Sequence, residues 1–205
     1  TRPEKLNIPL KRKKPAVYAI WNDLHHESIN NSFLCDVYST IKYSQQHAFL
    51  VLTKRPHIMI KRVPFYPGSE SSNVWHGLTI CNQQEADEKI PVFLKVPGKK
   101  FLSIEPMLGK TSLRWLAAWD GMATKPRPST TNHLDGLRLI DAVILGGETG
   151  SKARPVELHW IRNIRNECAE AGVPFFLKHI SKKDGRMLDG RTYDNLPWYN
   201  KTKEA

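Results

Sequence analysis

Short apolar runs alternate with longer amphipathic segments along most of this chain. Six runs have the length and continuous apolar character of buried strands, and they cover residues 16–21, 48–53, 74–80, 101–104, 142–145 and 174–177. Helical spacing of apolar residues is found over 29–45, 56–63, 83–94 and 157–171. Apolar strands separated by helices are typical of a parallel sheet covered by helices. The pattern therefore predicts an α/β fold of repeated βα units, either a full or partial TIM-like barrel or an open doubly wound sheet.

Two local signals refine the ends of the predicted helices. Apolar residues recur every four positions from Ile29 to Ile41, and Ser28 stands before them as a candidate N-cap. Gly172 follows the segment 157–171, where a glycine commonly ends a helix in the left-handed conformation. We expect helices to begin just after Ser28 and to end at Gly172.

Three polar stretches interrupt the pattern without indicating a second domain. Residues 1–15 contain six lysines and arginines and one acid, which predicts a solvated lead-in to the first strand, or alternatively an arm that contacts phosphates. Residues 118–137 are expected to be a surface insertion, and 181–205 a turn-rich C-terminal extension with Asp184-Gly185 and Asp189-Gly190 turns. We interpret 1–205 as a single βα-repeat domain.

Composition and charge narrow the class of protein. The 205 residues include 31 Lys and Arg against 20 Asp and Glu, so the formal net charge is +11, which favours polyanionic partners such as nucleic acid. Cys35, Cys81 and Cys168 are widely spaced, which excludes a Cys-x-x-Cys metal motif and indicates a reducing, cytoplasmic compartment. The two cysteines in predicted helices, Cys35 and Cys168, are expected to be packing residues. No apolar run approaches the roughly 20 residues of a membrane span, so no membrane association is expected.

Polar residues follow each apolar run directly. The carboxyl ends of parallel strands lie at one end of the sheet, where the active sites of βα proteins are found. The residues at these ends include acids, bases, cations and glycines: Asp23, His26, Lys54, Arg55, Asn82, Glu105, Gly146, Gly147, Glu148 and Lys178. Carboxylates and imidazoles transfer protons, and lysine and arginine bind phosphates or carboxylates. We expect these residues to form one site.

Each of these residues also has a purely structural interpretation. Asp23 can cap a turn, and the neighbouring histidines, His25 among them, can be half-exposed loop residues. Glu105 can form a buried ion pair with Lys178 or Arg55, and the glycine pair after the fifth run can be an ordinary turn.

Several strings, taken together, carry a family resemblance. They are NDLHHE at 22–27, LTKRP at 52–56, NVWHG at 73–77, FLSIEPMLG at 101–109, LGGETG at 145–150, ARP at 153–155, VPFFLK at 173–178 and LDGRT at 188–192. With these strings the chain resembles the phage Gp37/Gp68 family, a domain of unknown function that is similar to radical S-adenosylmethionine (SAM) proteins. The resemblance covers about residues 2–197.

The resemblance implies a cofactor and site roles. It implies SAM and a [4Fe–4S] cluster, with Gly146, Gly147 and Glu148 near the SAM. Asp23, His26, Glu105 and Lys178 would then be catalytic residues, and Lys54, Arg55 and Asn82 would bind substrate. The three-cysteine segment that holds the cluster in the family is absent from this chain, and its own cysteines lack suitable spacing.

Three functional hypotheses follow. The first is a phage- or prophage-encoded, cytoplasmic radical-SAM-like protein that acts on nucleic acid or a nucleotide and is inactive as the chain stands. Either a segment preceding Thr1 is missing, or the chemistry has been lost. The second is a non-enzymatic barrel that binds nucleic acid or a protein, and the third is a metal-dependent hydrolase using Asp23, His26 and Glu148. A barrel without its first strand would expose two sheet edges, so we also expect self-association.

Overall fold

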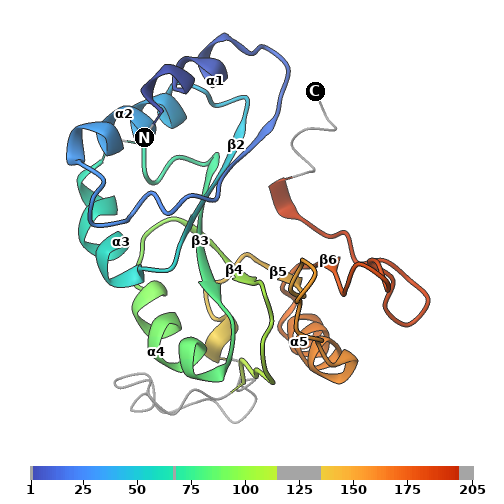
Figure 1. Ribbon diagram of the computed structural model, residues 1–205. Helices are drawn as coiled ribbons and strands as arrows, with labels where there is room; N and C mark the ends of the chain where they lie inside the picture. The colour runs from blue at the N-terminus through green and yellow to red at the C-terminus, as the bar shows by residue number, and fades with distance from the viewer. Residues whose placement is uncertain (1, 67, 115–134, 199–205) are drawn as a thin grey trace.

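The computed structural model describes residues 2–66, 68–114 and 135–198, and its helices and strands follow one another in a regular order (Figure 1). In chain order the elements are η1 (Pro3–Lys5), α1 (Asn7–Lys11), β1 (Val17–Ile20), α2 (Asn31–Lys42), β2 (Ala48–Thr53), α3 (Pro56–Arg62), η2 (Val63–Phe65), β3 (Val74–Ile80), α4 (Gln83–Phe93), β4 (Lys99–Ile104), η3 (Asp135–Leu137), β5 (Ala142–Gly146), α5 (Leu158–Ala171) and β6 (Phe175–His179). The α/β class and the six strands predicted from the apolar runs are confirmed.

The six strands form one sheet in the order β1-β2-β3-β4-β5-β6, and every neighbouring pair is parallel. The sheet is strongly curled into a half-barrel, with the helices on its convex side (Figure 1). Among the described residues β1 and β6 do not pair with each other, so these residues form a half-barrel rather than a closed barrel.

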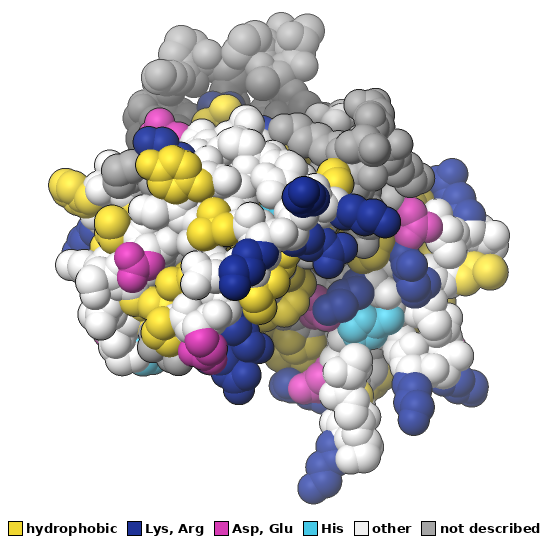
Figure 2. Space-filling view, turned by 90° about the horizontal axis from the view of Figure 1, so that it is seen from above, with side chains coloured by type: hydrophobic (Ala, Val, Ile, Leu, Met, Phe, Trp, Pro, Cys, Tyr) yellow, Lys and Arg dark blue, Asp and Glu magenta, His cyan; other side chains and the backbone are white. Residues whose placement is uncertain are grey.

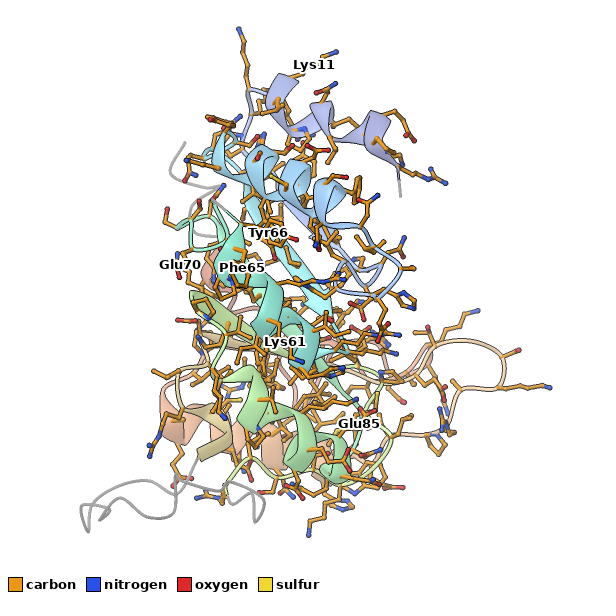
Figure 3. All side chains as sticks on the ribbon, turned by 90° about the vertical axis from the view of Figure 1, so that its left-hand side faces the viewer. Lys11, Lys61, Phe65, Tyr66, Glu70 and Glu85 are labelled. Carbon is orange, nitrogen blue, oxygen red and sulfur yellow. The ribbon has the colours of Figure 1, made fainter. Side chains whose placement is uncertain are left out.

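Alternate residues of each strand face opposite sides of the sheet, and both sides are apolar. On β2, Phe49 and Val51 belong to the core beneath the helices, whereas Leu50 belongs to a second cluster on the concave side. Seen from the side, α1, α2, α3 and α4 follow one another along the outer surface (Figure 3). This two-sided burial explains why the strands appear as continuous apolar runs in the sequence.

The concave side of the half-barrel is covered by the segment that follows β6. Trp198 is 1% exposed and packs edge-on against Trp75 and Phe101, with ring centroids 5.6 and 5.4 Å apart. A bridge between Phe176 and Asp194 leads the segment back along β6. The two predicted turns in 181–205 are present, with Gly185 and Gly190 at positive φ, but beyond them the extension supplies part of a core.

The N-terminal half adds detail to one prediction and corrects another. Residues 2–15 are mostly exposed and lead into β1, but they also contain η1 and α1, and His47 Nε2 donates to the Pro9 carbonyl at 3.0 Å. Ser28 is not the N-cap of α2. The N-cap is Asn30, whose Oδ1 accepts from the Phe33 amide at 2.8 Å, because residues 26–29 form a turn of their own before the helix.

Other boundaries agree with the predictions. Gly172 caps α5 with φ +68°, as expected. The predicted insertion 118–137 lies outside the described residues except for its end, where 135–137 form η3. Within the described ranges, no helix combines the length and the apolar character that crossing a bilayer requires.

Candidate functional site at the carboxyl ends of the strands

All six strands are parallel, so the residues that follow them lie at the same end of the half-barrel, which we call the rim. The rim comprises residues 21–27, 54–55, 81–82, 105–106, 146–154 and 178–183. Every residue predicted for the site lies there. The structure divides these residues into separate groups of contacts.

Asp23 organises the first group. Its Oδ1 accepts from Thr53 Oγ1 at 2.6 Å, and its Oδ2 accepts from Arg55 Nη1 at 2.6 Å and from the Lys54 amide at 3.2 Å. Burial alone would raise the pKa of Asp23, but the hydrogen bonds from Thr53 and Arg55 outweigh it and lower the pKa. Asp23 is therefore ionised at neutral pH, and its hydrogen bonds connect the loop after β1 to the end of β2.

Arg55 extends this group to Glu27, whose carboxylate also lies 3.8 Å from His26 Nδ1. Arg55 Nε lies 3.0 Å from the Glu27 carboxylate. His26 is half-exposed, and its Nδ1 lies 2.9 Å from Ser28 Oγ. His25 was expected to be half-exposed, but it is fully buried, with Nε2 3.2 Å from Tyr38 Oη, because the loop folds its ring under α2.

A second group joins Glu105, Lys178 and Trp21. Lys178 Nζ lies 2.7 Å from Glu105 Oε1, and 5.6 Å from the centre of the Trp21 ring. A Cβ on Gly146 would lie 3.3 Å from the Glu105 carboxyl carbon and 3.0 Å from His179 Cε1, so this glycine makes room for both side chains. Of the two partners suggested for Glu105, the structure pairs it with Lys178, but the ion pair is partly exposed and not buried as predicted, because the Lys178 side chain is 46% exposed.

Trp21 is the residue of this group that was not predicted. It is 49% exposed, at the end of an edge strand. Its position could have been found from the period of two along β1, because Val17 packs on the concave cluster and residues 19 and 21 share that side.

The glycine pair and Glu148 form a third group. A Cβ on Gly147 would lie 2.0 Å from the Ile180 carbonyl oxygen, so glycine is required here by the close approach of β5 and the chain after β6. Glu148 accepts from Arg154 Nε and Nη2, both at 2.8 Å, and from the Arg154 amide at 2.9 Å. These hydrogen bonds lower the pKa of Glu148 to about 2. The glycine pair and Glu148 thus stabilise the loop after β5. Their contacts do not leave an open binding site for a ligand.

Asn82 and Lys54 differ in how far they are already engaged. Asn82 Oδ1 caps α4 by accepting from the Glu85 amide at 2.9 Å, and Glu85 Oε2 accepts from the Cys81 amide at 2.7 Å. The ammonium of Lys54 has no acidic partner among the described residues. A substrate-binding role for either residue stays a prediction.

The cysteines do not fit an iron–sulfur cluster. Cys35 is exposed on α2, Cys81 is half-buried at the rim, and Cys168 is buried on α5, where burial raises the pKa of its thiol. Exposure shows that Cys35 is not the packing residue we expected, whereas Cys168 is. In the part of the chain that is described, no three His, Cys, Asp or Glu side chains come together as a metal site. The described residues therefore supply neither three thiolates nor the cluster of Asp23, His26 and Glu148 that a metal-dependent hydrolase would need.

The charge of the rim is balanced near its centre and positive around it. The carboxylates of Asp23, Glu27, Glu105 and Glu148 are all paired with Arg55, Lys178 or Arg154. Lysines without an acidic partner among the described residues follow β2, β5 and β6, and they are Lys54, Lys152, Lys182 and Lys183. Figure 2 shows another face of the molecule, where lysine and arginine side chains also surround deeper hydrophobic ones.

Comparison with known proteins gives one result. The family model described as "Protein of unknown function (DUF5131)" matches residues 1–197. No curated protein and no solved structure matches the chain.

Proposed function

We propose that the rim of this chain, which belongs to the DUF5131 family, binds a nucleotide or a single-stranded nucleic acid. The observation that carries the proposal is the half-exposed Trp21 beside the Lys178 ammonium. An indole face stacks on any nucleobase, and neighbouring lysines bind the phosphates.

The surroundings of Trp21 support this assignment. Trp21 is 49% exposed, so a base can approach its ring from solvent. Lys178 and Glu105 present a donor and an acceptor beside it, which suits the polar edge of a base. The lysines after β2, β5 and β6 that have no acidic partner in the described part of the chain supply the positive charge that a phosphate backbone requires, and the net charge of +11 acts in the same direction.

The test compares matched variants in a binding assay. Fluorescence anisotropy of a fluorescein-labelled twelve-nucleotide DNA or RNA strand should show binding at about 50 mM salt, and Trp21→Ala should weaken it about 5- to 100-fold, the worth of one stacked base. Tyr43→Ala is the aromatic control, because Tyr43 is 74% exposed at the end of α2. Its affinity should stay within twofold of that of the unchanged protein.

Charge is tested in the same assay. Lys54→Gln should reduce the dependence of log Kd on log salt by about 0.7 for the phosphate it contacts. Lys61 lies on α3, on the outer surface (Figure 3), and Lys61→Gln should leave the salt dependence unchanged. Equal binding by the protein and its Trp21→Ala variant, or no binding at low salt, would contradict the proposal.

A second candidate is the radical-SAM-like role implied by the resemblance to the phage Gp37/Gp68 family, with a cytoplasmic location in a bacterial host. The sequential, all-parallel and curled sheet supports this scaffold, but the separated cysteines do not support a bound cluster. We expect residues 1–205, treated anaerobically with iron and sulfide, to show no [4Fe–4S] absorption band. The appearance of that band would restore the radical-SAM assignment for this chain.

A further inference from the structure

The string LDGRT at 188–192 forms a tight turn outside the rim. The amides of Leu188 and Arg191 donate to each other's carbonyls at 3.0 and 3.2 Å. Between them, Asp189 and Gly190 both have positive φ angles, 53° and 76°, which is the geometry of a type I′ turn. Asparagine or glycine would fit the first of these positions as well as aspartate does. The carboxylate at position 189 must therefore be explained by its contacts.

Asp189 holds two arginines of α5 in place. Its Oδ1 accepts from Arg162 Nε at 3.0 Å and Nη2 at 2.8 Å, and its Oδ2 accepts from Arg165 Nη1 at 2.6 Å. These hydrogen bonds lower the pKa of Asp189 to about 2. Arg165 Nη1 also donates to Tyr193 Oη at 3.0 Å, and Arg191 Nε donates to the same oxygen at 2.8 Å. Three guanidinium groups are thus gathered around one carboxylate and one phenol.

This arginine cluster, made of Arg162, Arg165 and Arg191, keeps unused donors and an excess of positive charge. Three guanidiniums share one carboxylate, so two positive charges are left over. Among the described residues, Arg162 Nη1, Arg165 Nη2 and both Nη atoms of Arg191 have no hydrogen-bond partner. The Arg162 side chain is 40% exposed, and Arg191 is exposed as well. Guanidiniums that are already held in place bind a phosphate with little further loss of freedom.

Positive charge continues from the rim to the arginine cluster. The Leu177 amide donates to the Tyr193 carbonyl at 3.0 Å, so Tyr193 lies beside β6, next to the rim residue Lys178. The chain that leaves β6 loops outward beside α5 before it returns there (Figure 1). Residues 178–191 contain two acids and five basic residues, which are Lys178, Lys182, Lys183, Arg186 and Arg191.

We propose that the arginine cluster is a second phosphate site, which binds the backbone of a single-stranded nucleic acid beyond the base that stacks on Trp21. This inference rests on the function proposed for the rim and narrows its ligand. A ligand that occupies both sites carries more than one phosphate, so it is a strand rather than a mononucleotide. The cluster shares no residue with the rim, so the two sites can be altered separately.

Arg191→Gln tests the site in the anisotropy assay with the labelled twelve-nucleotide strand. Arg191 has two unused Nη atoms and does not hold Asp189. Its loss should weaken binding about threefold to tenfold at about 50 mM salt and reduce the dependence of log Kd on log salt by about 0.7, the share of one phosphate. Met187→Gln is the control, because Met187 is 60% exposed on the same hairpin and carries no charge. Its affinity should stay within twofold of that of the unchanged protein.

Asp189→Asn separates the position of the guanidiniums from their charge. Asparagine accepts the left-handed conformation, so the turn is kept, while the protein gains one positive charge. If the held guanidiniums bind the phosphate, their release should weaken binding of the strand at least twofold. Attraction by net charge alone would make binding tighter. Circular dichroism of both variants checks that the fold is intact.

Unchanged affinity in Arg191→Gln, or tighter binding in Asp189→Asn, would overturn the second phosphate site. The two proposals fail in different ways. If Trp21→Ala weakens binding and Arg191→Gln does not, the rim binds the strand without the arginine cluster. If Arg191→Gln weakens binding and Trp21→Ala does not, the rim proposal is wrong and the phosphate site remains without a stacked base beside it. No binding of the strand by the unchanged protein overturns both.

Discussion

Acidification from pH 7.5 to pH 5.0 should destabilise the protein by about 4 kcal/mol through His25 and His76. Both rings are fully buried. His76 Nε2 donates to the Ser69 carbonyl at 2.8 Å, and His25 Nε2 contacts Tyr38 Oη at 3.2 Å. Among the described residues, the Nδ1 atoms of both rings are buried without a hydrogen-bond partner. Protonation would therefore place an N–H and a charge where no acceptor is available.

The magnitude follows from the pKa values. Burial lowers the pKa of His25 to about 3 and that of His76 to about 4, against about 6.5 in the unfolded chain. The unfolded state thus binds more protons below pH 6.5, so the stability is full above that pH and falls as the pH approaches the folded values. At pH 5.0 each histidine costs about 2 kcal/mol, and carboxylates with ordinary values near 4 contribute little in this interval.

Urea denaturation followed by circular dichroism at half-unit steps from pH 7.5 to 5.0 measures the slope. Below pH 6 it should approach about 2.7 kcal/mol per pH unit, and His76→Gln or His25→Gln should each remove about half of it. His57→Gln is the control, because His57 lies on the exposed part of α3 and should leave the slope unchanged. If the slope stays below about 0.5 kcal/mol per unit, or is identical in the His76 variant, the assignment of neutral buried rings is refuted.

Three further changes probe the features that hold the half-barrel together. Trp198→Ala should cost about 3–5 kcal/mol and lower Tm by roughly 6–20 °C in calorimetry, and a loss below 1 kcal/mol would show that the segment does not pack as described. Gly147→Ala should lower the free energy of unfolding in urea by at least about 3 kcal/mol, because the added Cβ meets the Ile180 carbonyl. Gly109→Ala is the control, because a Cβ there has space, and it should cost under about 1 kcal/mol. Equal costs would contradict this reasoning. Asp23→Asn should cost about 1–3 kcal/mol at pH 7, because the charged hydrogen bonds of Asp23 are lost. Its difference from the unchanged protein should begin to shrink as the pH falls below about 3.9, the ordinary pKa of an aspartate in the unfolded chain, and a difference that grows on acidification would count against the charged network.

The layers of the fold could be predicted from the sequence because buried strands of a parallel sheet appear as continuous apolar runs, which are a local pattern. Runs such as Ala48–Thr53 and Val74–Ile80 are apolar on both faces, which occurs where helices cover one side and further apolar residues the other. The same pattern could not show how far the sheet closes. Closure depends on strand tilt and on what meets the edges, which are properties of distant residues.

The role of the last residues illustrates this limit. Trp198 follows a polar, turn-rich stretch, and nothing in its neighbourhood signals burial. Its packing against Trp75 and Phe101 joins residues about a hundred positions apart, which no local period records. The interpretation of 181–205 as an extension therefore described the turns correctly and missed the core residues beyond them.

The sequence predicted which side chains lie at the rim, but it did not predict most of their ion-pair and hydrogen-bond partners. Parallel strands place Asp23, Glu105 and Lys178 at one end, as expected, and opposite charge suggested the pairing of Glu105 with Lys178. The ion pair of Glu148 with Arg154 depends on the conformation of a loop, which the sequence pattern does not reveal. From the sequence alone, the Glu148 carboxylate was therefore expected to be free to bind a ligand. Trp21 was overlooked because an aromatic residue at the end of an apolar run reads as core.

The Trp198 segment also sets an order for synthesis. A ribosome that has released the chain through β6 has delivered the whole sheet and its helices, yet the concave face still lacks its cover. About twenty residues remain to be made before Trp198 can reach Trp75, which takes roughly 1–4 s at ordinary elongation rates. During that interval the apolar concave face of a nearly complete half-barrel is exposed to chaperones and to other nascent chains.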